Sequence, residues 1–261
     1  MIGLWLELPT WALFAVLTLG YGATGAVITW LAVASPVSPW IKSFTGVVAP
    51  FMATVSVLFS LLTGFLAGDI ADRNRQAWRA VNGEASAIVM VNTLSIAAAS
   101  DMAAIRAQLR TYVDSVLKDE WPAMAEGRRS AATGTALRDL LREVADPAIA
   151  RDAGQTVHAA LLNAVIRVRD ARADRLALAS DQTNDVKWLT VLALGLVTQI
   201  AVALVHLDKP RAKVAAMAVF TLGAVIALGL VALQEYPFSG HMRVSPVPLE
   251  RTLALITPPG G

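Results

Sequence analysis

A stripe of small and hydroxyl-bearing side chains lies on one apolar segment of this sequence. Its members are separated alternately by three and four positions, so in an α-helix they share one face. Hydroxyl groups on such a face can meet water in an ion path, or they can let neighbouring helices approach and hydrogen-bond. Packing is the commoner use of small residues in membranes, and both interpretations stay open at this point. The stripe consists of Ala53, Ser56, Ser60, Thr63 and Ala67.

The same segment carries a second stripe, which is bulky and apolar. If this helix lines a pore, we expect Ser56, Ser60 and Thr63 to face the ion path, because small hydroxyl-bearing side chains hydrate readily. We expect Phe65 and Leu66 to narrow the path near the end of the segment, since a ring of such residues tends to exclude water. The bulky stripe consists of Phe51, Val55, Leu58, Leu62 and Phe65.

Charged residues crowd the position at which this apolar segment ends. Asp69, Asp72, Arg73 and Arg75 come first, and Arg79 follows one turn later. Acids and bases at these spacings can pair across helical turns as a solvated anchor. They can also form a charged vestibule that concentrates ions. The sequence alone favours neither interpretation.

The remaining residues form no pattern typical of catalysis, of a cofactor site or of a metal site. His158, His206 and His241 lack the spacing of a helical metal site, and the chain contains no cysteine. The letters GYGATG at 20–25 match a dinucleotide-binding pattern, but they lie inside an apolar segment and not between a strand and a helix. Close packing of helices explains these glycines better. We therefore expect no enzyme, no cofactor and no bound metal.

Membrane-spanning helices must position these residues, because the composition is 56 % hydrophobic and only 16 % charged, with a mean hydropathy of +0.56. Four segments are long enough to cross a hydrocarbon core of about 30 Å at about 1.5 Å per residue. A formal net charge of +2 is too small to indicate binding to nucleic acid. We predict an all-α protein in a lipid bilayer, with four transmembrane helices at 11–33, 47–68, 188–207 and 214–234.

The long segment between the second and third spans predicts a soluble helical bundle. Residues 85–100 are uncharged but too few to cross a bilayer, which indicates a buried helix, and EGRRSAATGT at 126–135 predicts a loop. No proline separates the second span from the charged segment, so we predict one continuous helix that leaves the membrane. The expected organisation is an N-terminal part with spans one and two at 1–68, the bundle at 69–187, spans three and four at 188–236, and a proline-rich tail at 237–261.

Three short motifs, in this order, resemble elements of the bacterial bestrophin-like integral membrane proteins. The first is an arginine and Glu-Ala-x-Ala-like element after the second span, the second an R-x-x-R-L element before the third span. The third is a Pro-Phe-x-Gly tail after the fourth span, and the similarity covers about 45–255. The matching residues are Arg73, Arg75, Glu84, Ala85, Ala87, Arg172, Arg175, Leu176, Pro237, Phe238 and Gly240.

The resemblance implies a multi-pass protein of the bacterial plasma (inner) membrane, with both termini and residues 69–187 in the cytoplasm. It also implies a homo-oligomer, in bestrophins a pentamer, whose second membrane helix lines an axial pore for small ions and continues into a cytosolic vestibule. Basic residues near the spans are more numerous on the insert's side, although short loops carry more weight in setting orientation. The short loops on the opposite side contain Lys42, Lys209, Arg211 and Lys213.

The chain departs from the animal members of that family in its tail. Those proteins clasp calcium with a run of acidic residues, whereas here Glu250 is the only acid after Glu235. We therefore expect no calcium sensor. A membrane sensor or scaffold that does not conduct is the competing interpretation, in which paired helices transmit a signal across the bilayer. No kinase, cyclase or methyl-accepting segment follows the spans, and a current through the reconstituted protein would separate the two interpretations.

Overall fold

The computed structural model describes residues 2–98, 100–181 and 183–257, and over these residues the chain is helical and contains no strand. Four helices are long and apolar enough to cross a membrane. The prediction of an all-α protein with four such helices is therefore confirmed. They are α2 (Thr10–Val33), α4 (Ala49–Ala97), α10 (Asp185–Val205) and α11 (Pro210–Ala232), and the short helices α1 (Ile2–Leu6) and α3 (Ser38–Lys42) flank α2.

The chain folds into two compact units. Unit 1 contains Met1–Asp72 and Gln182–Glu235, and it therefore holds the membrane segments. Unit 2 contains Arg73–Asp181 and Tyr236–Gly261, so the C-terminal tail folds together with the segment between the second and third membrane helices.

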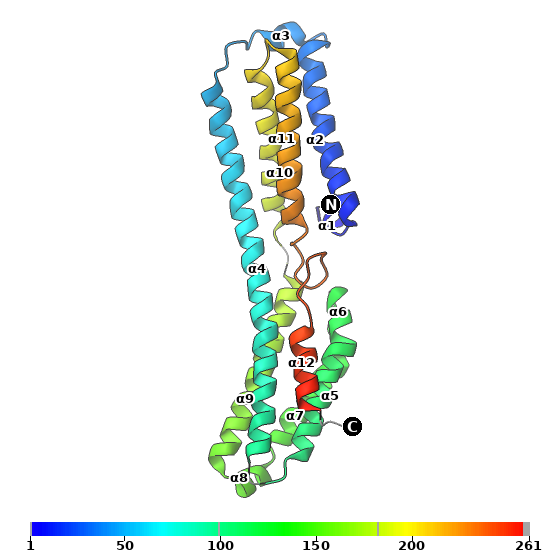
Figure 1. Cartoon of the computed structure of the whole chain (residues 1–261), viewed down its shortest axis with the longest axis vertical. Coiled ribbons are helices and arrows are strands. Elements are labelled where there is room, and N and C mark those ends of the chain that lie inside the picture. The colour runs from blue at the N-terminus through cyan, green and yellow to red at the C-terminus, as the bar shows by residue number, and fades with distance from the viewer. Residues whose placement is uncertain (1, 99, 182, 258–261) are drawn as a thin grey trace. The chain divides into compact units, whose positions relative to one another are not determined.

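Helix α4 runs through both units without a break, as Figure 1 shows. Its 49 residues contain one proline, Pro50, in the first turn, where the missing N–H has no partner to lose. The expected continuous helix is therefore present. The connection from unit 2 back to unit 1 is not one continuous helix. Helix α9 (Gln155–Ser180) ends, and a new helix, α10, begins at Asp185. The side chain of Asn184 caps this new helix by accepting a hydrogen bond from the backbone N–H of Val186.

Glycines let aromatic side chains approach the helices of unit 1 closely. A Cβ atom at Gly229 of α11 would overlap the ring of Phe14, which α2 contributes. A Cβ atom at Gly195 of α10 would overlap the ring of Tyr21, also from α2. Helix α2 thus packs on α10 and α11 through two ring-on-backbone contacts that only glycine permits.

A polar side chain also ties these three helices together. Gln199 of α10 is fully buried, and its Nε2 donates to the carbonyl of Tyr21 at 2.9 Å and to the hydroxyl of Thr221 at 3.1 Å. The hydroxyl of Thr24 donates to Oε1 of Gln199 at 2.7 Å. Because lipid offers no hydrogen bonds, such a satisfied amide is a favourable way to join helices within a membrane.

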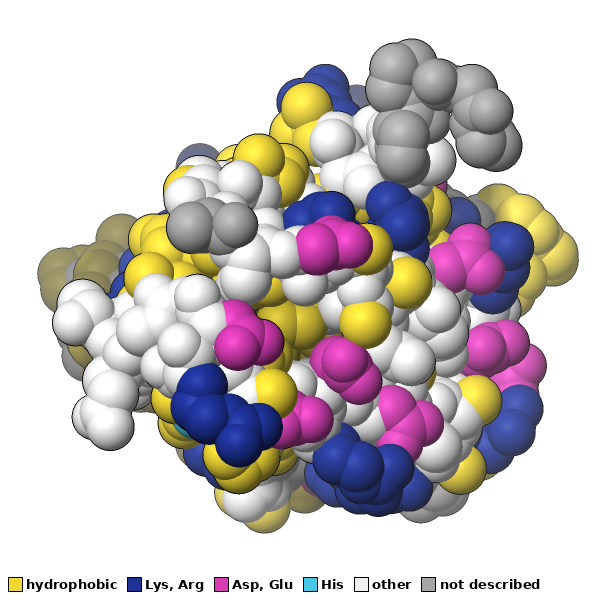
Figure 2. All heavy atoms as spheres, turned by 90° about the horizontal axis from the view of Figure 1, so that it is seen from below, with side chains coloured by type: hydrophobic (Ala, Val, Ile, Leu, Met, Phe, Trp, Pro, Cys, Tyr) yellow, Lys and Arg dark blue, Asp and Glu magenta, His cyan; other side chains and the backbone are white. Residues whose placement is uncertain are grey.

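Unit 2 is a bundle around one apolar core, and the core-facing side of α4 includes Ala77, Val81, Ile88 and Val91. Acidic and basic side chains lie interspersed with apolar ones on the end of this unit seen in Figure 2. Its further helices are α5 (Ala103–Ser115), the π-helix η1 (Val116–Glu120), α6 (Trp121–Ala125), α7 (Ala131–Val144), α8 (Pro147–Ala153) and α12 (Val247–Ile256).

Helix α7 begins inside the stretch that we predicted as a loop. The hydroxyl of Ser130 accepts a hydrogen bond from the backbone N–H of Thr133 at 3.2 Å and so caps the helix at its first turn. Only 126–130 are non-helical, and they follow the end of α6 at Ala125. The prediction of a loop over 126–135 is therefore wrong in its second half, because a good capping residue outweighs the low helix propensity of Gly134.

Candidate functional site

The membrane segment of α4 packs against the rest of unit 1 along one face only. Phe59 is buried, and its ring lies 5.6 Å from the ring of Phe220 of α11, measured between centroids. Met52 packs on an apolar cluster of α10 and α11, and Leu66 is buried as well. These three α4 residues are seven positions apart, so they lie in one line along the helix.

The opposite face of this segment is not covered by described residues of the chain. Gly64 and Gly68 have no atom within 4 Å of the place where a Cβ would stand. In a bilayer such a face meets lipid, water or another protein chain. The exposed residues of this open face are Thr54, Val57, Leu61, Gly64 and Gly68.

The stripe of small residues forms one edge of the open face. Ser60 is exposed, whereas Ser56 and Thr63 are half-buried beside the packed face. The hydroxyl oxygen of Thr63 is itself buried and has no hydrogen-bond partner among the described residues. The three predicted residues therefore share one edge of the helix, with Ser60 farthest toward the open side.

Phe65 and Leu66, which we predicted to narrow an ion path together, point in different directions. Phe65 is 61 % exposed and lies at the other edge of the open face. Leu66 is only 2 % exposed and packs inside unit 1. Adjacent residues on a helix are about 100° apart, so only one of them can face the open side. We therefore withdraw Leu66 from that prediction and keep Phe65.

The charged residues after the membrane segment form ion pairs within each unit. In unit 1 the carboxylate of Asp69 contacts the ammonium group of Lys187 at the start of α10. In unit 2 Nε of Arg73 lies 3.6 Å from the carboxylate of Asp181, just after α9. The other two predicted residues here, Asp72 and Arg75, also have interaction partners. Pairing between helices thus accounts for part of this charged cluster.

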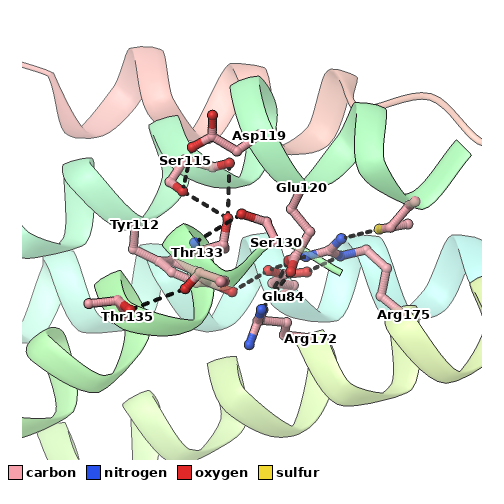
Figure 3. Close-up of polar contacts among 12 residues, drawn as sticks. Glu84, Tyr112, Ser115, Asp119, Glu120, Ser130, Thr133, Thr135, Arg172 and Arg175 are labelled. Atoms are coloured by element: carbon pink, nitrogen blue, oxygen red, sulfur yellow. Dashed lines mark hydrogen bonds and ion pairs between the residues drawn. The ribbon is translucent and has the colours of Figure 1, made fainter. Parts of the chain in front are cut away.

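Glu84 of α4 lies in the core of unit 2 and is held by two side chains from other helices (Figure 3). Arg175 of α9 donates to its two oxygens through Nε at 2.6 Å and through Nη2 at 3.1 Å. The hydroxyl of Tyr112 of α5 donates to Oε1 at 2.5 Å. All three side chains are fully buried, so this group of contacts is closed to solvent.

A second buried carboxylate, Glu120 of η1, completes the network. Arg175 donates to its Oε2 through Nη2 at 2.9 Å, and Arg172 donates to both oxygens at 2.9 and 2.5 Å. Two guanidinium groups therefore balance two carboxylates. This balance matters because an unpaired charge in a protein interior costs several kcal/mol, on the order of the whole stability of a domain.

The network shifts the pKa values of its members in ways that keep it intact. Burial, the charge of Glu84 and the hydrogen bond to Glu84 together raise the pKa of Tyr112 well above 10. Burial alone would lower the pKa of Arg175, but the charge and hydrogen bonds of Glu84 outweigh it and raise the pKa. The pKa of Arg172 is raised in the same way, since the bonded carboxylate of Glu120 outweighs partial burial. Both arginines therefore stay charged.

The Pro-Phe-x-Gly motif of the tail packs onto this network through Trp121. The ring of Phe238 meets the ring of Trp121 edge to face, with centroids 5.8 Å apart. The guanidinium carbon of Arg175 lies 5.7 Å from the same indole, a cation–π distance. All three sequence motifs thus converge on one buried place, although they come from segments far apart in the chain.

Gly240 lies in a turn that brings Phe238 into place. Its backbone N–H donates to the carbonyl of Tyr236 at 3.0 Å, and a Cβ atom on Gly240 would lie 2.6 Å from that same oxygen. The backbone N–H of Val244 donates to the carbonyl of Pro237 at 2.7 Å and closes the turn. Only glycine permits the close approach at this position.

The network is a structural joint and has no free reactive group. All four carboxylate oxygens of Glu84 and Glu120 accept hydrogen bonds. In the part of the chain that the structure describes, no three His, Cys, Asp or Glu side chains are arranged to hold a metal ion. What the arrangement can do is fasten α4 to η1 and α9 with defined geometry.

Sequence reasoning identified Glu84, Arg172 and Arg175 but missed Tyr112 and Glu120. Glu120 faces inward because η1 is one turn of π-helix, in which the N–H of Trp121 bonds the carbonyl of Val116. Pro122 lies two residues after the end of η1, and a proline that clashes with the preceding turn is a common cause of such widening. An acid two positions before a proline inside a helix was the available signal.

Comparison with known proteins agrees with this architecture. The profile of the bestrophin-like domain matches residues 19–249. A crystal structure of a single-residue variant of a bacterial bestrophin homolog from Klebsiella pneumoniae aligns with a TM-score of 0.67 at 11 % identity, covering 93 % of this chain and 98 % of that one. Another structure of a Klebsiella pneumoniae bestrophin homolog gives 0.62 at 12 % identity, with 93 % and 95 % covered.

Identities this low show similarity of fold alone. No curated protein matches the sequence. The family profile, however, extends from the first membrane helix to the tail helix and covers most of the residues. The chain therefore belongs to the bestrophin-like family and has the bestrophin fold.

Proposed function

We propose that this protein is a homo-oligomeric ion channel in which the membrane segment of α4 lines an axial pore. One observation carries the proposal: the open face of α4 lies uncovered by its own chain, and the same helix continues unbroken into unit 2. An oligomer would bring several copies of α4 around one axis, and five copies is the number that we propose. The path would then continue between copies of unit 2, which forms the vestibule.

The edge of α4 that carries Ser56, Ser60 and Thr63 is the edge that we place toward water. Ser60 is exposed on this edge, and small hydroxyl-bearing side chains hydrate readily. Lipid would offer its hydroxyl no hydrogen-bond partner, whereas water in a conduit or a polar group of a neighbouring copy would. We place Phe65 nearer the neighbouring copy or the narrow end of the path, where a large apolar ring limits hydration.

The buried joint around Glu84 gives unit 2 a mechanical role in this proposal. It fastens α4 to α9 and η1 with charge-assisted hydrogen bonds, which are directional and strong. A wall of fixed geometry would keep a vestibule open while the membrane segment moves. Asp69, Asp72, Arg73 and Arg75 lie at the entrance to that vestibule in this arrangement.

Conduction through single-cysteine variants tests the proposal, since the chain has no native cysteine. Purified protein is reconstituted into planar bilayers, and current is recorded before and after a water-soluble thiol reagent. We expect Ser60→Cys to react and to change the current. Leu66→Cys, on the packed face about 1.7 turns farther along the helix, is the matched control and stays silent. Reaction of Phe65→Cys with silence of Ser60→Cys would place the opposite edge of α4 in the pore.

The competing function, a scaffold that does not conduct, makes a separate prediction. A scaffold shows no current for any small ion, although its oligomer can be intact. Mass measurement in mild detergent and particle imaging report the number of copies and the presence of an axial hole. A monomer of uniform mass would contradict the pore, because one copy leaves the face of α4 unpaired.

We also propose that the protein lies in the plasma membrane of a bacterium with its termini and unit 2 in the cytoplasm. In that orientation Lys42→Cys and Arg211→Cys, in the short loops, react with an impermeant reagent added to intact cells. Arg128→Cys, in unit 2, does not. Labelling of Arg128→Cys in place of the loop variants would reverse the orientation.

A further inference from the structure

A polar cavity lies in unit 2 at the place where α4 ends. Its volume is about 570 Å³, and its walls are the last turns of α4, one face of α5 and the last turn of α12. The polar side chains that line it are Asn92, Ser95, Ser100, Asp101, Arg106, Arg110 and Thr257.

Two arginines on successive turns of α5 point into this cavity. Arg106 donates from Nη1 to the carbonyl of Ser95 at 3.0 Å and from Nη2 to Asp101 at 3.3 Å. Arg110 donates from Nη1 to the carbonyl of Ile256 at 3.3 Å. The two guanidinium groups therefore cap the C-terminal carbonyls of α4 and α12, which lack partners within their own helices.

Capping uses only part of what these side chains offer. A guanidinium group carries five N–H donors, and in the described chain Arg110 directs one of them to a protein acceptor. Two positive charges face one carboxylate, and that carboxylate, Asp101, is 82 % exposed while the side chain of Arg106 is 26 % exposed. The cavity thus has an excess of positive charge and of donors, and both arginines on its wall are half-buried.

We propose that this cavity binds a small oxyanion, a phosphate or a carboxylate group. Planar guanidinium groups recognise both through paired N–H donors. The amide of Asn92 and the hydroxyl of Ser100 line the same cavity and supply neutral donors. A bound oxyanion would join the end of α4 to α5 and α12, and this site is separate from the buried joint around Glu84.

Binding is tested on the full-length protein in detergent with inorganic phosphate as the probe. Titration calorimetry and thermal unfolding are recorded at constant ionic strength, with chloride as the balancing ion and acetate as the carboxylate arm. We expect saturable phosphate binding and a rise in unfolding temperature that follows the occupancy. Stronger binding of phosphate than of acetate identifies phosphoryl groups as the ligand class, and the reverse order identifies carboxylates.

Substitutions in the cavity separate binding from stability. Arg110→Gln removes a charged donor and should weaken binding by about tenfold or more. Asn92→Asp keeps the size of the side chain and places a negative charge on the wall, so it should weaken binding while the protein still folds. Arg138→Gln, on the exposed side of α7, is the control and leaves the affinity unchanged.

The same measurements can overturn the site. Equal affinity in the wild-type protein and in Asn92→Asp and Arg110→Gln would place the anion elsewhere. Equal stabilisation by chloride and phosphate at one ionic strength would show general screening of charge and no site. Because binding is read without any current, failure of the pore proposal leaves this result unaffected.

Discussion

Helix α4 passes through two environments, and the same helix is built differently in each. Its membrane segment, 49–68, has no charged residue and packs along the single line of Met52, Phe59 and Leu66. Its part in unit 2 is a member of the core and carries the buried charge of Glu84. Both stretches expose one face in the single chain, but only the stretch in unit 2 closes its packed face around an ion network, and we call it the closed stretch.

The difference lies in what each environment demands of a side chain. In lipid an uncovered apolar face is no liability, so the membrane segment can leave a face for another copy or for an ion path. In water a buried carboxylate must be paired, and each partner fixes the position of another helix. The open stretch is therefore suited to assembly, and the closed stretch is suited to holding one shape.

The largest expected effect comes from breaking the closed stretch at Arg175. Arg175→Met leaves Glu84 and Glu120 buried with fewer partners, and we expect a loss of about 3–5 kcal/mol in the free energy of unfolding of unit 2. Chemical unfolding in detergent measures it, followed by fluorescence in a background that keeps Trp121 as the single tryptophan of the seven. The double variant Arg175→Met with Glu84→Gln removes one charge of each sign and should recover part of the loss. No recovery would mean that packing of Arg175, and not charge, is what matters.

Glycine substitutions compare a packed face with the open one inside the membrane. Gly229→Ala places a Cβ atom against the ring of Phe14, and we expect a loss of about 1–3 kcal/mol. Gly64→Ala meets no atom of its own chain and gains helix propensity, up to about 1 kcal/mol. Thermal unfolding and oligomer mass are measured for both. Loss of the oligomer in Gly64→Ala would show that another copy lies on the open face.

The four spans and the unbroken second helix were predictable because they depend on local properties. Segments without charge that are long enough to cross lipid can be read from the sequence, and so can the absence of a proline near Gly68. The helical spacing of Ser56, Ser60 and Thr63 likewise predicts a shared edge. Which side of α4 packs is not local, since it depends on Phe220 in a helix far along the chain. The sequence alone therefore could not show that Leu66 is buried in the single chain.

The joint in unit 2 was predictable only in part for the same reason. Resemblance to a family pointed to Glu84, Arg175 and Phe238, but spacing cannot say that these residues meet. Contacts between them depend on the packing of helices separated by 91 positions in the Glu84–Arg175 pair. Glu120 was missed because its inward direction depends on the single π-helical turn of η1.

Alkaline pH should lower the stability of the closed stretch by a smaller amount than the substitutions above. The pKa of Tyr112 is raised well above 10, so below about pH 10 the residue is protonated in both the folded and the unfolded chain. As the pH rises above that value, the unfolded chain loses the proton and the folded chain keeps it. Stability should then fall by at most about 1.4 kcal/mol per pH unit from this group. The difference in unfolding temperature between the wild type and Tyr112→Phe isolates it, and parallel curves would contradict it.

The smallest expected effect concerns the border between the two stretches. Asp69 and Lys187 form an ion pair in which the side chains are 48 % and 55 % exposed in the single chain. Solvated pairs of this kind contribute about 0.2–1 kcal/mol and weaken with salt, so Asp69→Asn should lower stability slightly at low salt and hardly at all near 1 M. Thermal unfolding at two salt concentrations, with Asp139→Asn as an exposed control, decides it. A loss above about 2 kcal/mol that persists in salt would mean that the pair is enclosed in the assembled protein, because only desolvated charges escape screening. Exclusion of water from paired charges, as around Glu84 in unit 2, would then extend to the residues that directly follow the membrane segment at Gly68.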